Sequence, residues 1–164
     1  QFQRTPTYSD FMQSFKYLEK TLCESLRLNP SVPFIGRTCV CDTTLPKVSG
    51  DDRQYTIRKH DLVLVNNYAQ ARNPKVWGDD AEEYNPDRWT KGLNTFDQYT
   101  FTAFNVNPRL CLGKSFAIQE AKIFGYYFLK NFKFEMVKGH RVRMRSGAIS
   151  NMENGLPVVL TARK

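Results

Sequence analysis

The sequence has little of the chemistry that zinc-binding and disulfide-rich proteins use. Only two histidines occur, and the four cysteines, Cys23, Cys39, Cys41 and Cys111, show no paired CxxC spacing. This pattern argues against a zinc site. Four cysteines among 164 residues also argue against a disulfide framework. Because Cys39 and Cys41 stand two apart in a strand-like run, we expect both to be packing residues.

Long apolar runs are also missing. The longest, around residues 123–129, has about seven residues, far fewer than a membrane span needs. The chain starts at Gln1 without a methionine, and no signal-peptide pattern follows it. We therefore expect no transmembrane segment within these residues, and we expect the chain to be a fragment of a longer protein.

The net charge of +8 is unevenly distributed. Residues 130–164 hold eight Lys and Arg against two acids, whereas residues 76–88 hold five acids. A basic end can bind nucleic acid, an anionic membrane surface or an acidic protein, and it can equally be a solvated face. Arg141, Arg143 and Arg145 alternate without an interleaved aromatic platform, so we expect no nucleic-acid partner.

Apolar periodicity divides the chain into helices, strands and one long loop. We expect a helix over residues 9–28 with Ser9 as its N-cap, and a second over 113–131. The second is apolar nearly all round, which is typical of a helix buried on several sides and indicates a larger fold. Residues 90–112 are irregular but aromatic, as in a packed functional loop. Strands are expected over 34–45, 55–57, 62–66, 133–137 and 158–161, with turns at Leu45–Pro46 and Ser49–Gly50 and a hairpin turn at Asn154–Gly155.

Two charged residues on the first helix have two possible interpretations. Glu24 and Arg27 are three residues apart, as in an exposed ion pair worth a few tenths of a kcal/mol. Cys23 and Leu28 flank the same face, so the pair can instead be covered. A covered guanidinium needs further partners, and Arg88 could join by sharing the Glu24 carboxylate.

Cys111 stands just before Gly113 and the start of the second helix. Backbone amides at a helix start favour negative charge and lower the pKa of a thiol, so Cys111 can be a nucleophile or a metal ligand. Neither histidine is near in sequence to act as the base of a nucleophile. A thiolate supported by amides also suits a haem iron, and Arg109 would then face a haem propionate. A buried, inert cysteine remains the alternative.

Three motifs in order carry a family resemblance. Glu24-Ser25-Leu26-Arg27 resembles the E-x-x-R signature, and Pro86-Asp87-Arg88-Trp89 resembles P-E-R-F. Residues 104–113, FNVNPRLCLG, resemble the cysteine-ligand loop F-x-x-G-x-R-x-C-x-G. Together they look like the C-terminal third of a cytochrome P-450, a haem-thiolate monooxygenase. The resemblance covers essentially the whole chain, and the wording of the loop is similar to fatty-acid and alkane hydroxylases of fungi and plants.

The resemblance implies a role for each matching residue. Cys111 matches the proximal ligand of the haem iron and is thus the implied catalytic and metal-binding residue. Arg109 and Arg37 match arginines that bind the haem propionates, while Phe104 and Gly113 match the remaining cofactor-binding positions of the loop. Glu24, Arg27 and Arg88 match a buried triad that holds the cysteine loop. The substrate-pocket candidates are Phe34, Ile35 and Ile149.

One position of the loop departs from the family pattern. The family glycine is Asn107 here. We expect a positive φ at this position, and asparagine is the residue other than glycine that adopts it most readily. The loop is therefore expected to keep its shape.

The implied fold is that of a cytochrome P-450, mainly α with small β-sheets, with residues 1–164 as the C-terminal part of a single haem domain. The implied cofactor is haem b, and the reaction inserts one oxygen atom from O₂ into a C–H bond of a hydrophobic substrate, fatty acid or alkane. The implied partner is a flavoprotein reductase with an acidic docking face, with Lys114 as a candidate contact.

The family's oxygen-activating helix and membrane anchor would precede residue 1. The parent is therefore expected at the cytosolic face of the endoplasmic reticulum membrane, attached through that anchor, and this fragment alone is expected to be inactive. Two alternatives share the fold: a haem-thiolate isomerase or dehydratase, and a haem-binding protein without catalysis.

Overall fold

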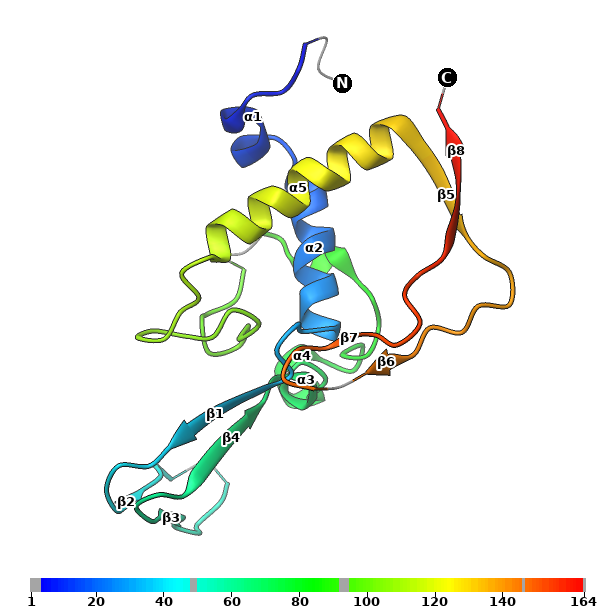
Figure 1. Ribbon diagram of the computed structural model, residues 1–164. Coiled ribbons are helices and arrows are strands. Elements are labelled where there is room, and N and C mark those ends of the chain that lie inside the picture. The colour runs from blue at the N-terminus through cyan, green and yellow to red at the C-terminus, as the bar shows by residue number, and fades with distance from the viewer. Residues whose placement is uncertain (1–3, 48–49, 92–94, 146, 164) are drawn as a thin grey trace.

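Figure 1 shows a computed structural model of the chain, which describes residues 4–47, 50–91, 95–145 and 147–163. Helices form the centre of the described part of the chain, and its strands form four two-stranded antiparallel sheets. The mixture of helices with small sheets matches the expected fold class. Ser49, the first residue of one expected turn, lies outside the described residues.

The first predicted helix is in fact two helices, α1 (Tyr8–Gln13) and α2 (Lys16–Leu28). The predicted N-cap Ser9 is wrong: Thr7 caps α1, in a capping box with Asp10. No glycine or proline marks the break. Tertiary packing accounts for it, because the rings of Phe11 and Phe15 stack and both lie against Tyr126.

Two strand pairs follow α2. β1 (Phe34–Thr38) pairs with β4 (Leu62–Asn66), and at the far end of this ribbon β2 (Thr43–Thr44) pairs with β3 (Thr56–Ile57). The strand predicted over residues 34–45 is therefore interrupted, with Cys39 and Cys41 in the connection. Cys41 is exposed, which contradicts its predicted packing role, whereas Cys39 is half-buried.

Three short helical segments carry the chain back toward α2. They are α3 (Asn67–Gln70), α4 (Pro74–Trp77) and the 3₁₀ segment η1 (Pro86–Arg88). Each begins after an asparagine whose side-chain oxygen accepts a backbone N–H at the start of the segment. These caps explain why such short segments form, and η1 packs directly against α2.

The long helix α5 (Lys114–Asn131) crosses α2 and also packs against α1 (Figure 1). Its buried residues include Ile118 and Lys122, whose ammonium pairs with Glu19 of α2. The opposite face is open, with Phe116 and Phe124 about two-thirds exposed. In the described part of the chain, α5 is thus covered on one side only. A shallow apolar hollow of about 630 Å³ lies on the open face.

Both predicted C-terminal strands form, within one residue of their expected bounds. β5 (Phe132–Met136) pairs with β8 (Val158–Ala162), while β6 (Met144–Arg145) pairs with β7 (Asn151–Met152). The turn at Asn154–Gly155 forms, with Gly155 at φ +64°, but it joins β7 to β8, and these two do not pair. The predicted hairpin is therefore wrong.

An aromatic core lies where α2, α4 and η1 meet the long loop. Trp89 is fully buried, and its ring contacts the rings of Trp77, Phe96 and Phe101 at centroid distances from 4.7 to 6.1 Å. Phe104 packs against the edge of this cluster. The core therefore reaches from the first helices into the loop that carries Cys111.

Candidate functional site

Cys111 lies at the end of a tightly turned loop that leads into α5. Its backbone N–H donates to the carbonyl of Phe104 at 2.8 Å, and its own carbonyl accepts from Lys114 N–H at 3.2 Å. The thiol is exposed. In the described chain the sulfur thus lies at the surface, as a nucleophile or a metal ligand requires and unlike a buried, inert cysteine.

The backbone of this loop corrects one expectation. The residue with positive φ is Asn105, at +63°, and not Asn107. Asn105 stabilises its own turn, because its Oδ1 accepts the N–H of Val106 at 2.9 Å. Gly113 is the N-cap of α5 at φ −82°. A Cβ on Gly113 would lie 3.8 Å from the Cys111 sulfur, an ordinary contact, so the described chain alone does not demand glycine here.

Glu24 and Arg27 form a buried, bidentate ion pair on α2. Arg27 Nε donates to Glu24 Oε2 and Arg27 Nη2 to Oε1, both at 2.8 Å. The two residues are 0% and 1% exposed, so the pair is covered rather than solvated. The remaining guanidinium hydrogens reach the backbone carbonyls of Ala71, Ala81 and Glu83.

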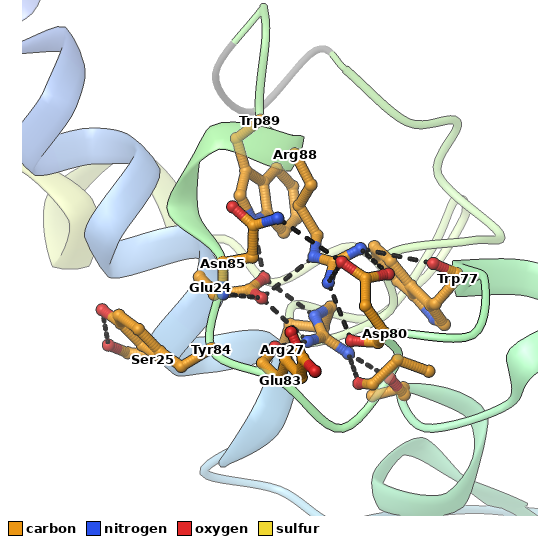
Figure 2. Close-up of polar contacts among 12 residues, drawn as sticks. Glu24, Ser25, Arg27, Trp77, Asp80, Glu83, Tyr84, Asn85, Arg88 and Trp89 are labelled. Atoms are coloured by element: carbon orange, nitrogen blue, oxygen red, sulfur yellow. Dashed lines mark hydrogen bonds and ion pairs between the residues drawn. The ribbon is translucent and has the colours of Figure 1, made fainter.

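Arg88 is the third member of the triad that the sequence suggested, beside Glu24 and Arg27. Its Nε donates to Glu24 Oε1 at 3.0 Å, and its Nη2 donates to Asp80 at 2.9 Å (Figure 2). The carboxylate of Glu24 also accepts the backbone N–H of Asn85 and Nε1–H of Trp89, both at 2.9 Å. Glu24 is thus the acceptor for two arginines, an indole and an amide.

The hydrogen bonds decide the charge state of this buried carboxylate. Burial acts to raise the pKa of Glu24, but the donors on Arg27, Asn85, Trp89 and Arg88 outweigh it, and the pKa is lowered. Burial likewise opposes the charge of Arg88, while Glu24 and Asp80 favour it more strongly and raise its pKa. Glu24 and Arg88 are therefore both charged at neutral pH.

The network connects to the cysteine loop through Trp89. While its Nε1 bonds Glu24, its ring contacts Phe101 edge-on at a centroid distance of 4.7 Å. Phe101 lies three residues before Phe104, whose carbonyl holds the backbone of Cys111. Glu24 is thus linked to the loop indirectly, through an aromatic side chain.

Two arginines lie at or near the loop. Arg37 of β1 donates to Asn105 Oδ1 at 3.3 Å and lines a cavity of about 310 Å³ together with Ile35 and Val106. Arg109 is exposed on the loop itself. Among the described residues, neither guanidinium has a carboxylate partner. Both are thus available for an external anion.

The substrate-pocket candidates lie on two segments that the fold joins. The backbone N–H of Ser150 donates to the carbonyl of Ser31 at 2.8 Å, which brings Ile149 beside the turn that leads to Phe34. Ile149 and Phe34 are exposed, at 66% and 48%, and Ile35 is half-buried. The apolar side chains therefore flank a common junction between residues far apart in sequence.

Several contacts around the candidate site were not found from the sequence. Asp80 stood out only as part of an acidic cluster, and it proves to be the second acid of Arg88. Trp89 was noted within its motif, but its indole donor to Glu24 was not foreseen. The buried side chain of Asn67, which links two segments around the cavity, gave no signal beyond its capacity to hydrogen-bond.

Comparison with known proteins identifies the family. The family model described as Cytochrome P450 matches residues 1–156. The chain is 37% identical over 158 residues to Noroxomaritidine synthase from Narcissus aff. pseudonarcissus MK-2014, covering 94% of this chain and 30% of that protein. It is 32% identical over 155 residues to Alkane hydroxylase MAH1 from Arabidopsis thaliana, covering 93% and 30% respectively. The chain belongs to the cytochrome P450 family, as the three motifs predicted.

These matches also limit which properties of the relatives can be assigned to this chain. A third relative, Cytochrome P450 52C2 from Candida maltosa, is 44% identical over 112 residues, which are 67% of this chain and 22% of that protein. The chain thus spans less than a third of the length of these relatives. The names of the first two relatives describe different products and substrates at similar identity, so resemblance alone does not select a substrate.

The described residues fit the haem b that members of this family bind. An exposed thiol on a closed loop supplies a soft ligand for iron. Arg37 and Arg109, which lack acid partners in the described part, supply donors for two carboxylates. Within the described ranges, no helix is both long enough and apolar enough to cross a membrane.

Proposed function

We propose that this chain is the C-terminal part of a single haem domain, and that the complete protein is a haem-thiolate monooxygenase. The observation that carries the proposal is the Cys111 loop, closed by the bond from Cys111 N–H to Phe104 and presenting an exposed thiol. When bound, haem b would supply the iron at which O₂ is cleaved with two electrons from a reductase and two protons, so that one oxygen atom enters a C–H bond of the substrate and the other leaves as water.

The residues of this chain would each contribute a defined part. Cys111 would be the axial thiolate ligand of the iron, and Arg37 and Arg109 would hold the propionates. Phe104 would shield the ligand loop from water, since it already packs on the aromatic core. Gly113, the N-cap of α5, would leave room for the cofactor.

The buried triad of Glu24, Arg27 and Arg88 would hold the loop in place before the cofactor binds. This proposed role is supported by the carboxylate of Glu24, whose two oxygens are both hydrogen-bonded, so that neither is free to form other bonds. A ligand loop that is already ordered loses less conformational entropy when its metal binds.

A small hydrophobic substrate would bind near Phe34, Ile35 and Ile149. The exposed apolar side chains of Phe34 and Ile149, on the two segments that the Ser150–Ser31 bond joins, support this assignment. The alkane hydroxylase among the relatives makes a fatty acid or alkane the first substrate class to test.

Electrons would come from a flavoprotein reductase that docks through an acidic face. Lys114, whose ammonium lies over the Phe104 ring, would be one contact, and association would weaken with salt.

The complete protein would lie at the cytosolic face of the endoplasmic reticulum membrane.

The test is a reduced, carbon-monoxide-bound difference spectrum of the complete protein and of its Cys111→Ser variant. A red-shifted Soret band that disappears in the variant is expected. An unshifted band in the unaltered protein, or a shifted band that survives in the variant, would refute the ligand assignment. Turnover of dodecanoic acid with a reductase then separates a monooxygenase from an isomerase or a non-catalytic haem protein.

A further inference from the structure

Asn67 is a buried polar residue to which the haem site assigns no role. It is 3% exposed and lies where β4 ends and α3 begins. The elements around it are the turn before β1 and the loop that leads to Cys111. Because a buried amide is costly unless it is hydrogen-bonded, its partners show what it holds together.

Asn67 binds the turn before β1 twice. Its backbone N–H donates to the carbonyl of Pro33 at 2.9 Å, and its Nδ2 donates to the carbonyl of Val32 at 3.0 Å. A carbonyl can only accept, so this second bond fixes which end of the amide is oxygen. The oxygen therefore points away from the turn.

That oxygen binds the cysteine loop. Thr102 Oγ1 donates to Asn67 Oδ1 at 2.8 Å, and Gln70 Oε1 lies 3.1 Å from the same hydroxyl. Gln70 is oriented in turn by donation from its Nε2 to the carbonyl of Tyr99 at 2.6 Å. The single hydroxyl hydrogen of Thr102 is thus shared between two oriented amide oxygens, of which Asn67 Oδ1 is the nearer, and this shared bond holds Thr102 to α3.

The resulting chain of contacts runs from the turn to the ligand loop. Val32 and Pro33 directly precede the pocket candidate Phe34, while Thr102 is two residues before Phe104, whose carbonyl holds Cys111. Thr102, Gln70 and Ile35 all line the cavity of about 310 Å³ that contains Arg37. A single side chain therefore ties the substrate-facing turn to the cysteine loop.

We infer that Asn67 and Thr102 are positioning residues that set the distance between the bound substrate and the iron ligand. This inference rests on the proposed monooxygenase function. Small displacements of a substrate from its reactive geometry strongly reduce rate and selectivity. The bond from Thr102 to Asn67 fixes the two segments that define this geometry.

The experiment compares Thr102→Val, which removes the hydroxyl at nearly constant shape, with Thr102→Ser, which keeps it. Both are made in the complete, haem-loaded protein. The first readout needs no substrate: amide hydrogen exchange of peptides covering residues 30–38 and 99–112. The second is the half-saturation concentration of dodecanoic acid in the spin-state titration, together with the carbons that become hydroxylated.

Thr102→Val should keep the red-shifted carbon-monoxide band, speed exchange in both peptides by about three- to tenfold, and spread hydroxylation over neighbouring carbons. Thr102→Ser should behave as the unaltered protein. Faster exchange in residues 99–112 alone, or equal effects of valine and serine, would overturn the inference.

Two outcomes separate this inference from the proposed function. If the unaltered protein gives no shifted band, the proposed function fails, while the exchange experiment still decides whether Asn67 couples the two segments. If Thr102→Val takes up no haem, Thr102→Ala replaces it. Alanine also removes the hydroxyl, but it does not place a methyl group where the hydroxyl stood. Loss of haem in both variants would show a purely structural role and overturn the inference.

Discussion

Trp89 Nε1 donates to Glu24 Oε2 at 2.9 Å, and both side chains are fully buried. The indole is therefore more than a filler of the aromatic core. Its N–H satisfies part of the hydrogen-bonding capacity of a carboxylate that lies in an apolar environment. Its ring also packs on the loop that leads to Cys111, so the indole connects the charged network with that loop.

Trp89→Phe should destabilise the protein by about 1.5–3 kcal/mol beyond any loss of packing, because the bond it removes ends on a charged group. Trp77→Phe is the matched control, since Trp77 Nε1 donates to the neutral carbonyl of Gln70 at 3.1 Å. Its loss should be nearer about 1 kcal/mol. Urea unfolding measures both, and equal losses would contradict the assigned role of the Glu24 charge.

Glu24→Gln should cost about 3–5 kcal/mol at pH 7, because it leaves Arg27 and Arg88 buried without their carboxylate. The folded pKa of Glu24 lies below the unfolded value of about 4.3, so the unfolded chain binds more protons in acid. The stability it contributes is complete above that value and is lost as pH falls through the folded pKa. The variant should therefore show a flatter decline of stability below about pH 5.

The control for this pH dependence is Asp51→Asn. Arg53 holds the pKa of Asp51 to about 2 through hydrogen bonds, but Arg53 is 76% exposed and solvent screens the pair. Unfolding midpoints at pH 7 and pH 4 should hardly change in this variant. A pH profile of Glu24→Gln parallel to that of the unaltered protein would show that Glu24 does not titrate as described.

Lys122 links α5 to the first two helices, because its ammonium pairs with Glu19 and lies 3.4 Å from the carbonyl of Phe11. Lys122→Met should speed amide exchange in α1 and lower the free energy of unfolding by about 1–3 kcal/mol. Combining it with Glu19→Leu should recover part of the loss, since both charges are then gone. A double variant that loses the sum of the two single losses would exclude a coupled pair.

Cys23 is fully buried, and burial, aided by Glu19, raises the pKa of its thiol to about 12. At pH 8 only about one molecule in ten thousand would carry the reactive thiolate. Iodoacetamide should therefore modify exposed Cys41 in the native protein and Cys23 only after unfolding. Peptide mass analysis follows both, and equal rates before unfolding would contradict the buried placement of Cys23.

The sequence predicted local features better than long-range ones. α5 and β4 lie at, or within a residue of, their predicted ranges, because apolar periodicity and strand composition act within a few residues. The contacts of Glu24 with Arg27 and Arg88 were expected from the helical spacing of the first two and from the resemblance that the three motifs carry together. The break between α1 and α2 was not, because it follows from packing on Tyr126, more than a hundred residues away.

The errors around the site have the same origin. A turn signal at Asn154–Gly155 identifies a reversal of the chain, but only tertiary pairing decides which strands β7 and β8 join. Positive φ falls on Asn105, whose side chain stabilises the turn, and the motif position Asn107 does not need it. Asn67 was missed because its partners come from segments that approach only in the folded chain.

Arg27 has a consequence for how the length of this chain can vary. Its guanidinium donates to the carbonyls of Ala71, Ala81 and Glu83. The number of residues between these three positions is therefore constrained, because all three carbonyls must reach the same buried side chain. A residue inserted between 81 and 83 would displace one of these carbonyls. In the connection from 39 to 61, which runs through β2 and β3 at the far end of the β1–β4 ribbon, none of the described residues (39–47 and 50–61) bonds to Arg27. Insertions or deletions there are therefore expected to leave the cysteine loop undisturbed.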